Sequence, residues 1–113
     1  MSTTDTGRQA EAAAADYLQK QGYKIVERNW KTPQCEIDIV AKKGACVYFV
    51  EVKYRVSSRQ GGGLDYITVA KQRQMRFAAE MWCAQHHWGG DASLAAIEVG
   101  GDFAVTDFID TIY

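Results

Sequence analysis

Two neighbouring apolar segments that carry acidic side chains constrain this chain more than any other feature of its sequence. They span residues 35–41 (CEIDIVA) and 47–53 (VYFVEVK), and a short turn separates them. Side chains on a strand alternate between its two faces, so Glu51 and Lys53 point the same way. If the segments pair as a hairpin, Asp38 lies on the adjacent strand within reach of both. The pattern therefore predicts two carboxylates and one ammonium close together on a sheet.

Charged groups on such apolar strands need a physical reason to be there. Their desolvation costs free energy unless something gathers them, and a hard divalent cation bound through oxygen atoms would do so. This interpretation makes the cluster a phosphodiester-cleaving site that uses a metal ion. The alternative is an ion pair of Glu51 and Lys53 on a solvated face. It is disfavoured because the rest of the second segment is apolar on both faces, as in a buried central strand: Val47, Tyr48, Phe49, Val50 and Val52.

Length and composition are those of a globular domain. With 113 residues, 47% of them hydrophobic and 24% charged, we expect one domain spanning residues 1–113. No apolar run is long enough to cross a bilayer, and residues 1–6 lack the blocks of a secretory signal. The three cysteines match neither a disulfide framework nor a metal-ligand pattern. The sequence therefore predicts a cytoplasmic protein with no membrane partner.

Charge is unevenly distributed along the chain. The net charge of −1 argues mildly against a protein that coats nucleic acid. Residues 1–76, however, contain all 13 Lys and Arg and carry a balance of +5, whereas residues 77–113 carry −6. Because the predicted site lies in the basic part, its surroundings can attract a phosphate backbone. The alternative is an accidental asymmetry that folds into a mixed surface, and both interpretations stay open at this point.

Hydrophobic periodicity and chain breakers predict the order α-β-β-β-α-β-β. An alanine-rich helix runs from about Gly7 to Gln21 and stops at Gly22, and Thr68 opens a second helix that ends near His87. These elements predict an α/β fold in which a mixed sheet is flanked by helices. The first expected strand opens with residues 23–26, and the next two are centred on residues 37 and 49. The last two strands are expected at 92–99 and 103–109, and a glycine-rich loop at 55–66.

Glu11 is a further candidate, on the first predicted helix. Positions 7, 11, 14 and 18 fall along one side of that helix, so Glu11 stands beside Ala14 and Leu18 at the edge of a buried stripe. A carboxylate in this position is more often a surface residue than a catalytic one. Helix geometry alone therefore leaves the role of Glu11 open.

An ordered set of residues resembles a known family. The set covers most of residues 7–55 and continues weakly through Lys71 and Arg73: Gly7-Arg8, Glu11, Ala14, Tyr17-Leu18, Gly22-Tyr23, Arg28-Asn29-Trp30, Glu36-Ile37-Asp38, and Phe49-Val50-Glu51-Val52-Lys53 with Arg55. It resembles the YraN-like family of bacterial proteins, which is similar to archaeal Holliday-junction resolvases. That family belongs to the restriction-endonuclease-like group with the PD-(D/E)XK motif, so the resemblance implies a restriction-endonuclease-like fold.

The resemblance also implies roles for individual residues. Glu11, Asp38, Glu51 and Lys53 would converge as the catalytic set at one edge of the sheet. Asp38 and Glu51, with the main-chain carbonyl of Val52, would bind Mg²⁺ or Mn²⁺. Lys53 would orient the attacking water or offset charge on the phosphate, and Glu11 would hold the metal through water or complete a second metal site. We expect the flanking basic residues to contact phosphates: Arg8, Arg55, Arg59, Lys71 and Arg73.

Two functions from different classes follow from this pattern. The first is a magnesium-dependent endonuclease acting on nucleic acid, with branched or structured DNA as the expected substrate. The second is a catalytically silent module of nuclease fold that binds nucleic acid or a protein partner. The intact Asp38, Glu51 and Lys53 favour the enzyme, because a purely binding module has no need of them. A homodimer is compatible with either function, although the sequence identifies no dimer surface.

Overall fold

β3 is the central strand of a five-stranded sheet. The computed structural model of the protein describes residues 3–56, 64 and 67–112. Within these residues the elements follow the predicted order α-β-β-β-α-β-β. They are α1 (Thr3–Lys20), β1 (Lys24–Lys31), β2 (Glu36–Lys43), β3 (Cys46–Arg55), α2 (Val69–Gln85), β4 (Asp91–Gly100) and β5 (Val105–Ile112).

The sheet is mixed, as the sequence predicts. Its strand order follows the chain, β1-β2-β3-β4-β5. All neighbouring strands are antiparallel except β3 and β4, which run parallel from the pair Cys46 and Asp91 to the pair Arg55 and Gly100. Parallel neighbours need a crossover connection, and α2 provides it. This α/β architecture, with its five-stranded sheet and two helices, is compatible with a restriction-endonuclease-like fold.

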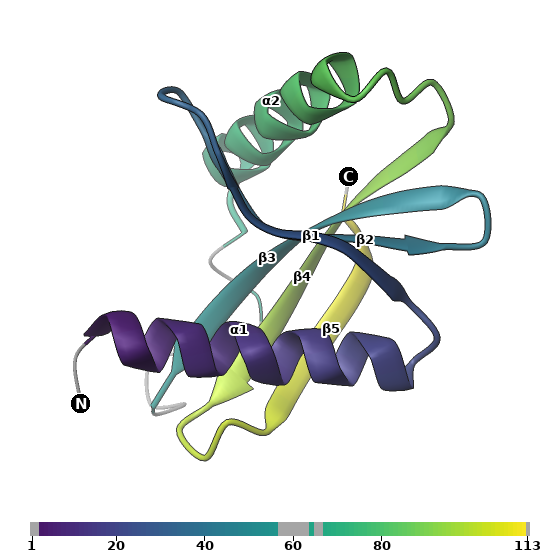
Figure 1. Cartoon of the computed structure of the whole chain (residues 1–113). Coiled ribbons are helices and arrows are strands. Elements are labelled where there is room, and N and C mark those ends of the chain that lie inside the picture. The colour runs from purple at the N-terminus through teal and green to yellow at the C-terminus, as the bar shows by residue number, and fades with distance from the viewer. Residues whose placement is uncertain (1–2, 57–63, 65–66, 113) are drawn as a thin grey trace.

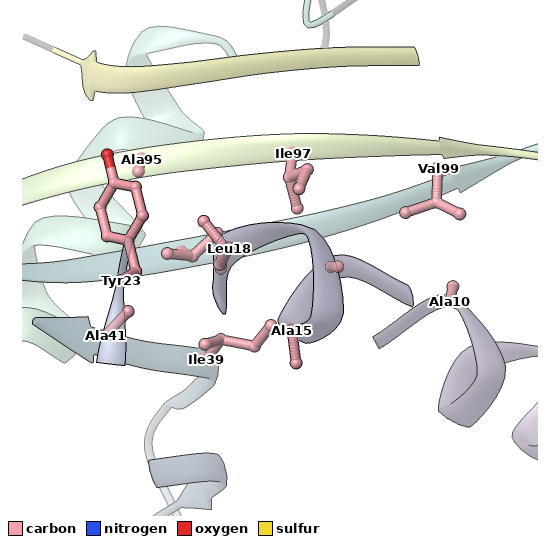
Figure 2. Packing of buried hydrophobic residues seen from close by; sticks show 11 residues of the cluster. Ala10, Ala15, Leu18, Tyr23, Ile39, Ala41, Ala95, Ile97 and Val99 are labelled. Atoms are coloured by element: carbon pink, nitrogen blue, oxygen red, sulfur yellow. The ribbon is translucent and has the colours of Figure 1, made fainter. Parts of the chain in front are cut away.

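α1 lies across one face of the sheet (Figure 1). It packs against the strands through small side chains. Ala10, Ala14 and Leu18 are buried along one side of the helix, and their spacing brings the helix backbone close to the strands. Figure 2 shows Leu18 in the cluster that also contains Ile39 of β2 and Ile97 of β4. Burying a leucine of this kind contributes roughly 1.5–3 kcal/mol to stability.

α2 covers the opposite face of the sheet. Neighbouring residues of β3 show this, because Val50 belongs to the α1 cluster whereas Phe49 packs with Trp82 and Met75 of α2. The rings of Phe49 and Trp82 meet edge to face with their centroids 5.5 Å apart. The Trp82 indole N–H donates to the Glu27 carboxylate at 3.1 Å, which satisfies the polar end of a buried ring.

Several element boundaries differ from the predicted ones. α2 ends at Gln85 rather than near His87, and β5 runs to Ile112 rather than to Ile109. α1 begins at Thr3, four residues earlier than expected, and Asp5 in its first turn suits the positive end of the helix dipole. β5 begins at Val105 rather than at Phe103, because Phe103 has a φ of 62° and closes a turn by donating its N–H to Gly100 O. Gly22 ends α1 with a φ of 95°, as predicted.

Candidate active site

β2 and β3 separate where their acidic residues lie. The β2–β3 ladder ends at the pair Ile39 and Val50, and beyond it the β1–β2 hairpin turns toward α2 while β3 passes behind α1 (Figure 1). The next pair in that register would join Asp38 to Glu51. There the Asp38 carboxylate accepts a hydrogen bond from the Val52 backbone N–H at 2.8 Å. A side chain thus satisfies a β3 amide and fixes Asp38 against the neighbouring strand.

The structure brings Asp38 and Glu51 together in one cleft. Glu51 follows Phe49 by two residues and therefore lies on the face of β3 that α2 covers. Asp38 and Glu51 both line a cleft of about 740 Å³ between β2, β3 and α2. Acidic, basic and apolar residues complete its lining, among them Glu36, Val52, Lys71, Arg73 and Phe77.

Asp38 lies in an environment that disfavours its negative charge. Burial, followed by the nearby negative charges of Glu51, Glu11 and Glu36, raises its pKa to about 7, against a hydrogen bond from Val52 N–H that acts to lower it. Glu11 on α1 is close enough for its charge to contribute to this raised pKa, and its catalytic role stays a prediction. Negative charge is therefore concentrated around the Asp38 carboxylate.

Lys71 supplies a cation to the same cluster. Its ammonium lies 2.9 Å from a Glu51 carboxylate oxygen, with 31% of the Lys71 side chain and 22% of the Glu51 side chain exposed. Thr68 caps α2 as predicted, and its hydroxyl accepts the Lys71 N–H at 3.1 Å. The cap sets the first turn of α2 so that Lys71 faces β3. We predicted a phosphate contact for Lys71, and in this structure the side chain lies inside the cleft.

The oxygen donors of the cleft suit a hard divalent cation. Asp38, Glu51 and the Val52 carbonyl are of the chemical type that Mg²⁺ and Mn²⁺ prefer. The raised pKa of Asp38 is a second sign of fit, because a cation would relieve the burial and repulsion that cause it. Among residues 3–56, 64 and 67–112, no three His, Cys, Asp or Glu side chains form a complete metal-binding group. A metal ion here would therefore depend on two carboxylates, a main-chain oxygen and ligands from substrate or water.

Comparison with protein families shows which family this chain belongs to. A model of the uncharacterised protein family UPF0102 matches residues 10–105. This chain belongs to the UPF0102 family. The match includes all four residues of the predicted catalytic set, Glu11, Asp38, Glu51 and Lys53.

Individual UPF0102 proteins are similar to this chain over most of its length. One from Chlorobium chlorochromatii is 51% identical over 81 residues, covering 72% of this chain and 63% of that protein. One from Paenarthrobacter aurescens is 44% identical, covering 71% and 66%, and one from Pseudomonas putida strain F1 is 40% identical, covering 78% and 72%. The chain spans just under two thirds of the length of the first two relatives.

Lys53 and the arginines predicted to contact phosphate lie in different parts of this UPF0102 protein. Lys53 lies two residues beyond Glu51 on the same face of β3 and is half-buried. Arg73 is exposed on α2 and lines the cleft, and Arg8 is exposed on α1. Arg59 lies outside the described residues. The phosphate contacts of Arg8 and Arg73 stay predictions.

Arg55 belongs to a second polar cluster, which sequence reasoning missed. Its guanidinium Nε lies 3.0 Å from the carboxylate of Glu98 on β4, and the Thr106 hydroxyl donates to Glu98 at 2.7 Å. Glu98 is only 6% exposed. We call Arg55, Glu98 and Thr106 the Glu98 cluster. The predicted phosphate contact of Arg55 stays a prediction, but its side chain already has an ionic partner inside the fold.

The described helices give no sign of a membrane segment. None of them, within residues 3–56, 64 and 67–112, is long and apolar enough to cross a bilayer.

Proposed function

We propose that this protein is a metal-dependent nuclease that hydrolyses phosphodiester bonds in branched or structured DNA. The observation that carries the proposal is the meeting of Asp38 and Glu51 in a polar cleft where two strands separate. The raised pKa of Asp38 supports it, because perturbed carboxylates are frequent at catalytic sites. The resemblance of the motif to the PD-(D/E)XK group adds support for the reaction class.

Each residue of the site would have a distinct task. Asp38, Glu51 and the Val52 carbonyl would hold Mg²⁺ or Mn²⁺, and the ion would supply Lewis-acid stabilisation of phosphate charge. The Val52 N–H fixes one carboxylate oxygen of Asp38, and Asp38 lines the cleft. Lys53, on the same strand face as Glu51, would orient the attacking water or stabilise charge on the phosphate. Glu11 would act from α1 through water or at a second metal site.

Basic residues near the cleft would hold the substrate. Arg73 lines the cleft and is exposed, so its guanidinium is available for phosphate oxygens. Lys71 is also placed at the cleft, where its contact with Glu51 can exchange for a contact with phosphate. The balance of +5 over residues 1–76 favours approach of a polyanion toward this part of the chain.

One contact favours the second candidate, a catalytically silent binding module. Lys71 partly neutralises Glu51 from within the protein, and a module without a metal ion would need such a partner. The two candidates differ in what Lys53 does. In a nuclease Lys53 assists the chemical step, whereas in a binding module it is one cation among several.

A cleavage assay tests the proposal. Linear, nicked and four-way-junction DNA are incubated with Mg²⁺ or Mn²⁺ and with wild type, Lys53→Ala or Lys20→Ala. Lys20 is an exposed lysine at the end of α1, paired with Asp16, so its variant removes the same charge outside the cleft. We expect Lys53→Ala to lower the cleavage rate by about 10²-fold or more, the scale for a positioned acid–base or electrostatic group. Lys20→Ala should cut at the wild-type rate.

Binding measurements separate the two candidates. Lys53→Ala should bind DNA almost as well as wild type, whereas Arg73→Ala should bind more weakly and with a flatter salt dependence. If the wild type binds junction DNA and never cuts it with either metal, and Lys53→Ala binds equally well, the nuclease proposal fails. The binding module then takes its place.

A further inference from the structure

Phe77 is an exposed aromatic side chain on the wall of the cleft. It is 46% exposed, and it is the one aromatic among the large hydrophobic side chains that are exposed in the described part of the chain. It lines the same cleft as Asp38 and Glu51. The neighbouring α2 residues Met75 and Ala78 are buried against the sheet, so the exposure of Phe77 is a property of its position. The ring therefore has a face that is accessible from the cleft.

The residues around Phe77 are cationic. α2 carries Lys71, Arg73 and Arg76 before its first acidic residue, Glu80. Arg73 stands one turn before Phe77 on the same side of the helix and lines the same cleft. An aromatic ring beside guanidinium and ammonium groups matches a ligand that joins a flat apolar group to an anion. A nucleotide has this composition, with its base as the flat group and its phosphate as the anion.

A base can reach the ring only where it is unpaired. Inside a continuous duplex each base is covered on both faces by its neighbours, whereas a flap, gap or bulge leaves a face uncovered. From this placement we propose that Phe77 stacks on an unpaired base whose phosphate is contacted by Arg73 in the cleft of Asp38 and Glu51. The preferred substrate class is then nucleic acid with an unpaired nucleotide next to a duplex. This inference rests on the proposed function, since it takes the cleft to be the nucleotide site.

Binding of labelled DNA tests the inference without cleavage. Fluorescence anisotropy in EDTA compares a duplex, the same duplex with a five-nucleotide flap, and the flap strand alone. We expect wild type to bind the flap more tightly than the duplex by about 5- to 150-fold, the range that one base–aromatic stack supplies. Phe77→Leu keeps an apolar side chain without a ring and should lose most of this preference, whereas Phe77→Trp should keep it. Arg73→Ala should weaken binding to all three probes by similar factors.

A spectroscopic probe reports the stack directly. 2-Aminopurine at the first unpaired position of the flap changes its fluorescence when it stacks on a ring. Wild type and Phe77→Trp should produce this change at saturating protein, and Phe77→Leu should not. Thermal unfolding of each variant verifies that it is folded. We expect this result because position 77 is partly exposed.

Several outcomes would overturn the inference and leave the proposed function standing. Equal affinity of wild type for flap and duplex would do so, as would an unchanged flap preference in Phe77→Leu, if cleavage with Mg²⁺ or Mn²⁺ persists. A dimer–monomer shift of Phe77→Leu in sedimentation, with unchanged DNA binding, would assign the ring to a second copy of the chain. Absence of any DNA binding by wild type, in contrast, would overturn the stacking inference and the proposed function together. Conversely, flap binding that depends on Phe77 without cleavage by either metal would reject the nuclease and retain the base contact.

Discussion

Two polar clusters lie on the same face of the sheet and treat charge in opposite ways. In the Glu98 cluster, one carboxylate meets the Arg55 guanidinium at 3.0 Å and the Thr106 hydroxyl at 2.7 Å. In the cleft, Lys71 lies 2.9 Å from Glu51, while the Asp38 carboxylate beside it is buried among the negative charges of Glu51, Glu11 and Glu36. The parallel register joins the two regions, because Lys53 pairs with Glu98 across β3 and β4. One strand therefore borders both clusters.

The difference indicates which cluster serves the fold. The carboxylate of Glu98 is balanced from within the protein and is almost fully buried. In the cleft, burial and, to a smaller extent, the negative charges around Asp38 raise the pKa of its carboxyl group to about 7. A raised carboxylate pKa costs stability at neutral pH, and perturbed carboxylates are frequent at functional sites. The contrast therefore supports a structural role for the Glu98 cluster and the proposed ligand-binding role of the cleft.

The largest predicted effect is on the Glu98 cluster. Glu98→Gln keeps an acceptor for Thr106 but removes the charge opposite Arg55. Breaking a buried ion pair leaves the other charge unbalanced, so the free energy of unfolding should fall by about 3 kcal/mol. Chemical denaturation measures the change, with Asp91→Asn, an exposed acid at the start of β4, as the control. Equal, small losses in both variants would show that the Glu98 cluster contributes little to stability.

The second prediction concerns the pH dependence of stability: removing the charge of Asp38 should raise stability, whereas removing that of Glu98 should lower it. The pKa of Asp38 is about 7 in the fold, above its ordinary value of 3.8, so the folded state binds this proton more tightly than the unfolded state does. The charge of Asp38 therefore lowers stability progressively between about pH 4 and pH 7, and the loss persists above pH 7. In EDTA at pH 8, Asp38→Asn should be about 2 kcal/mol more stable than wild type, a value reduced for partial solvent exposure.

Denaturation at several pH values tests this sign. The advantage of Asp38→Asn should shrink as pH falls and vanish near pH 4, where Asp38 of wild type is protonated in the fold. Asn also retains an oxygen for the Val52 N–H, so the hydrogen bond is not lost with the charge. Asp38→Asn that is less stable than wild type at pH 8 would place Asp38 with Glu98 as a structural residue.

The smallest predicted effect is the coupling between Lys71 and Glu51. Partly exposed ion pairs contribute up to about 1 kcal/mol, and a double-mutant cycle of Lys71→Met and Glu51→Gln should give roughly that value in EDTA. With Mg²⁺ the coupling should fall, because a metal ion would compete for the Glu51 oxygens. The exposed pair Lys20 and Asp16 serves as control. A Lys71–Glu51 coupling that Mg²⁺ does not alter would show that Glu51 is not a ligand.

Local rules predicted the strands and the parity of the acidic residues. Alternation along β3 was sufficient to place Glu51 and Lys53 on one face, and the short turn after Lys43 was sufficient to bring Asp38 beside Glu51. Gly22 and Thr68 marked helix ends because capping depends on one or two residues. Features that are determined by residues close together in the sequence, such as strand parity and helix ends, could therefore be predicted.

Contacts between distant segments could not be predicted in the same way. The Lys71–Glu51 pair depends on how α2 crosses the sheet, which no periodicity in residues 69–85 specifies. The partners of Glu98 depend on the register of β4 with β3 and on an irregularity between β4 and β5 near Val99. Glu98 is the one charged residue in the otherwise apolar segment 94–99, and this was the sequence signal for a buried ionic partner.

Calorimetric titration with Mn²⁺ at pH 7 tests most directly the claim that the cleft receives a cation. We predict binding by wild type, with release of about half a proton per ion, because Asp38 is near its pKa and must ionise to bind metal. Repeating the titration in buffers of different ionisation enthalpy measures that proton. The double variant Asp38→Asn, Glu51→Gln should neither bind Mn²⁺ nor release a proton. Binding by the double variant equal to that of wild type would show that the metal lies elsewhere and would contradict the account.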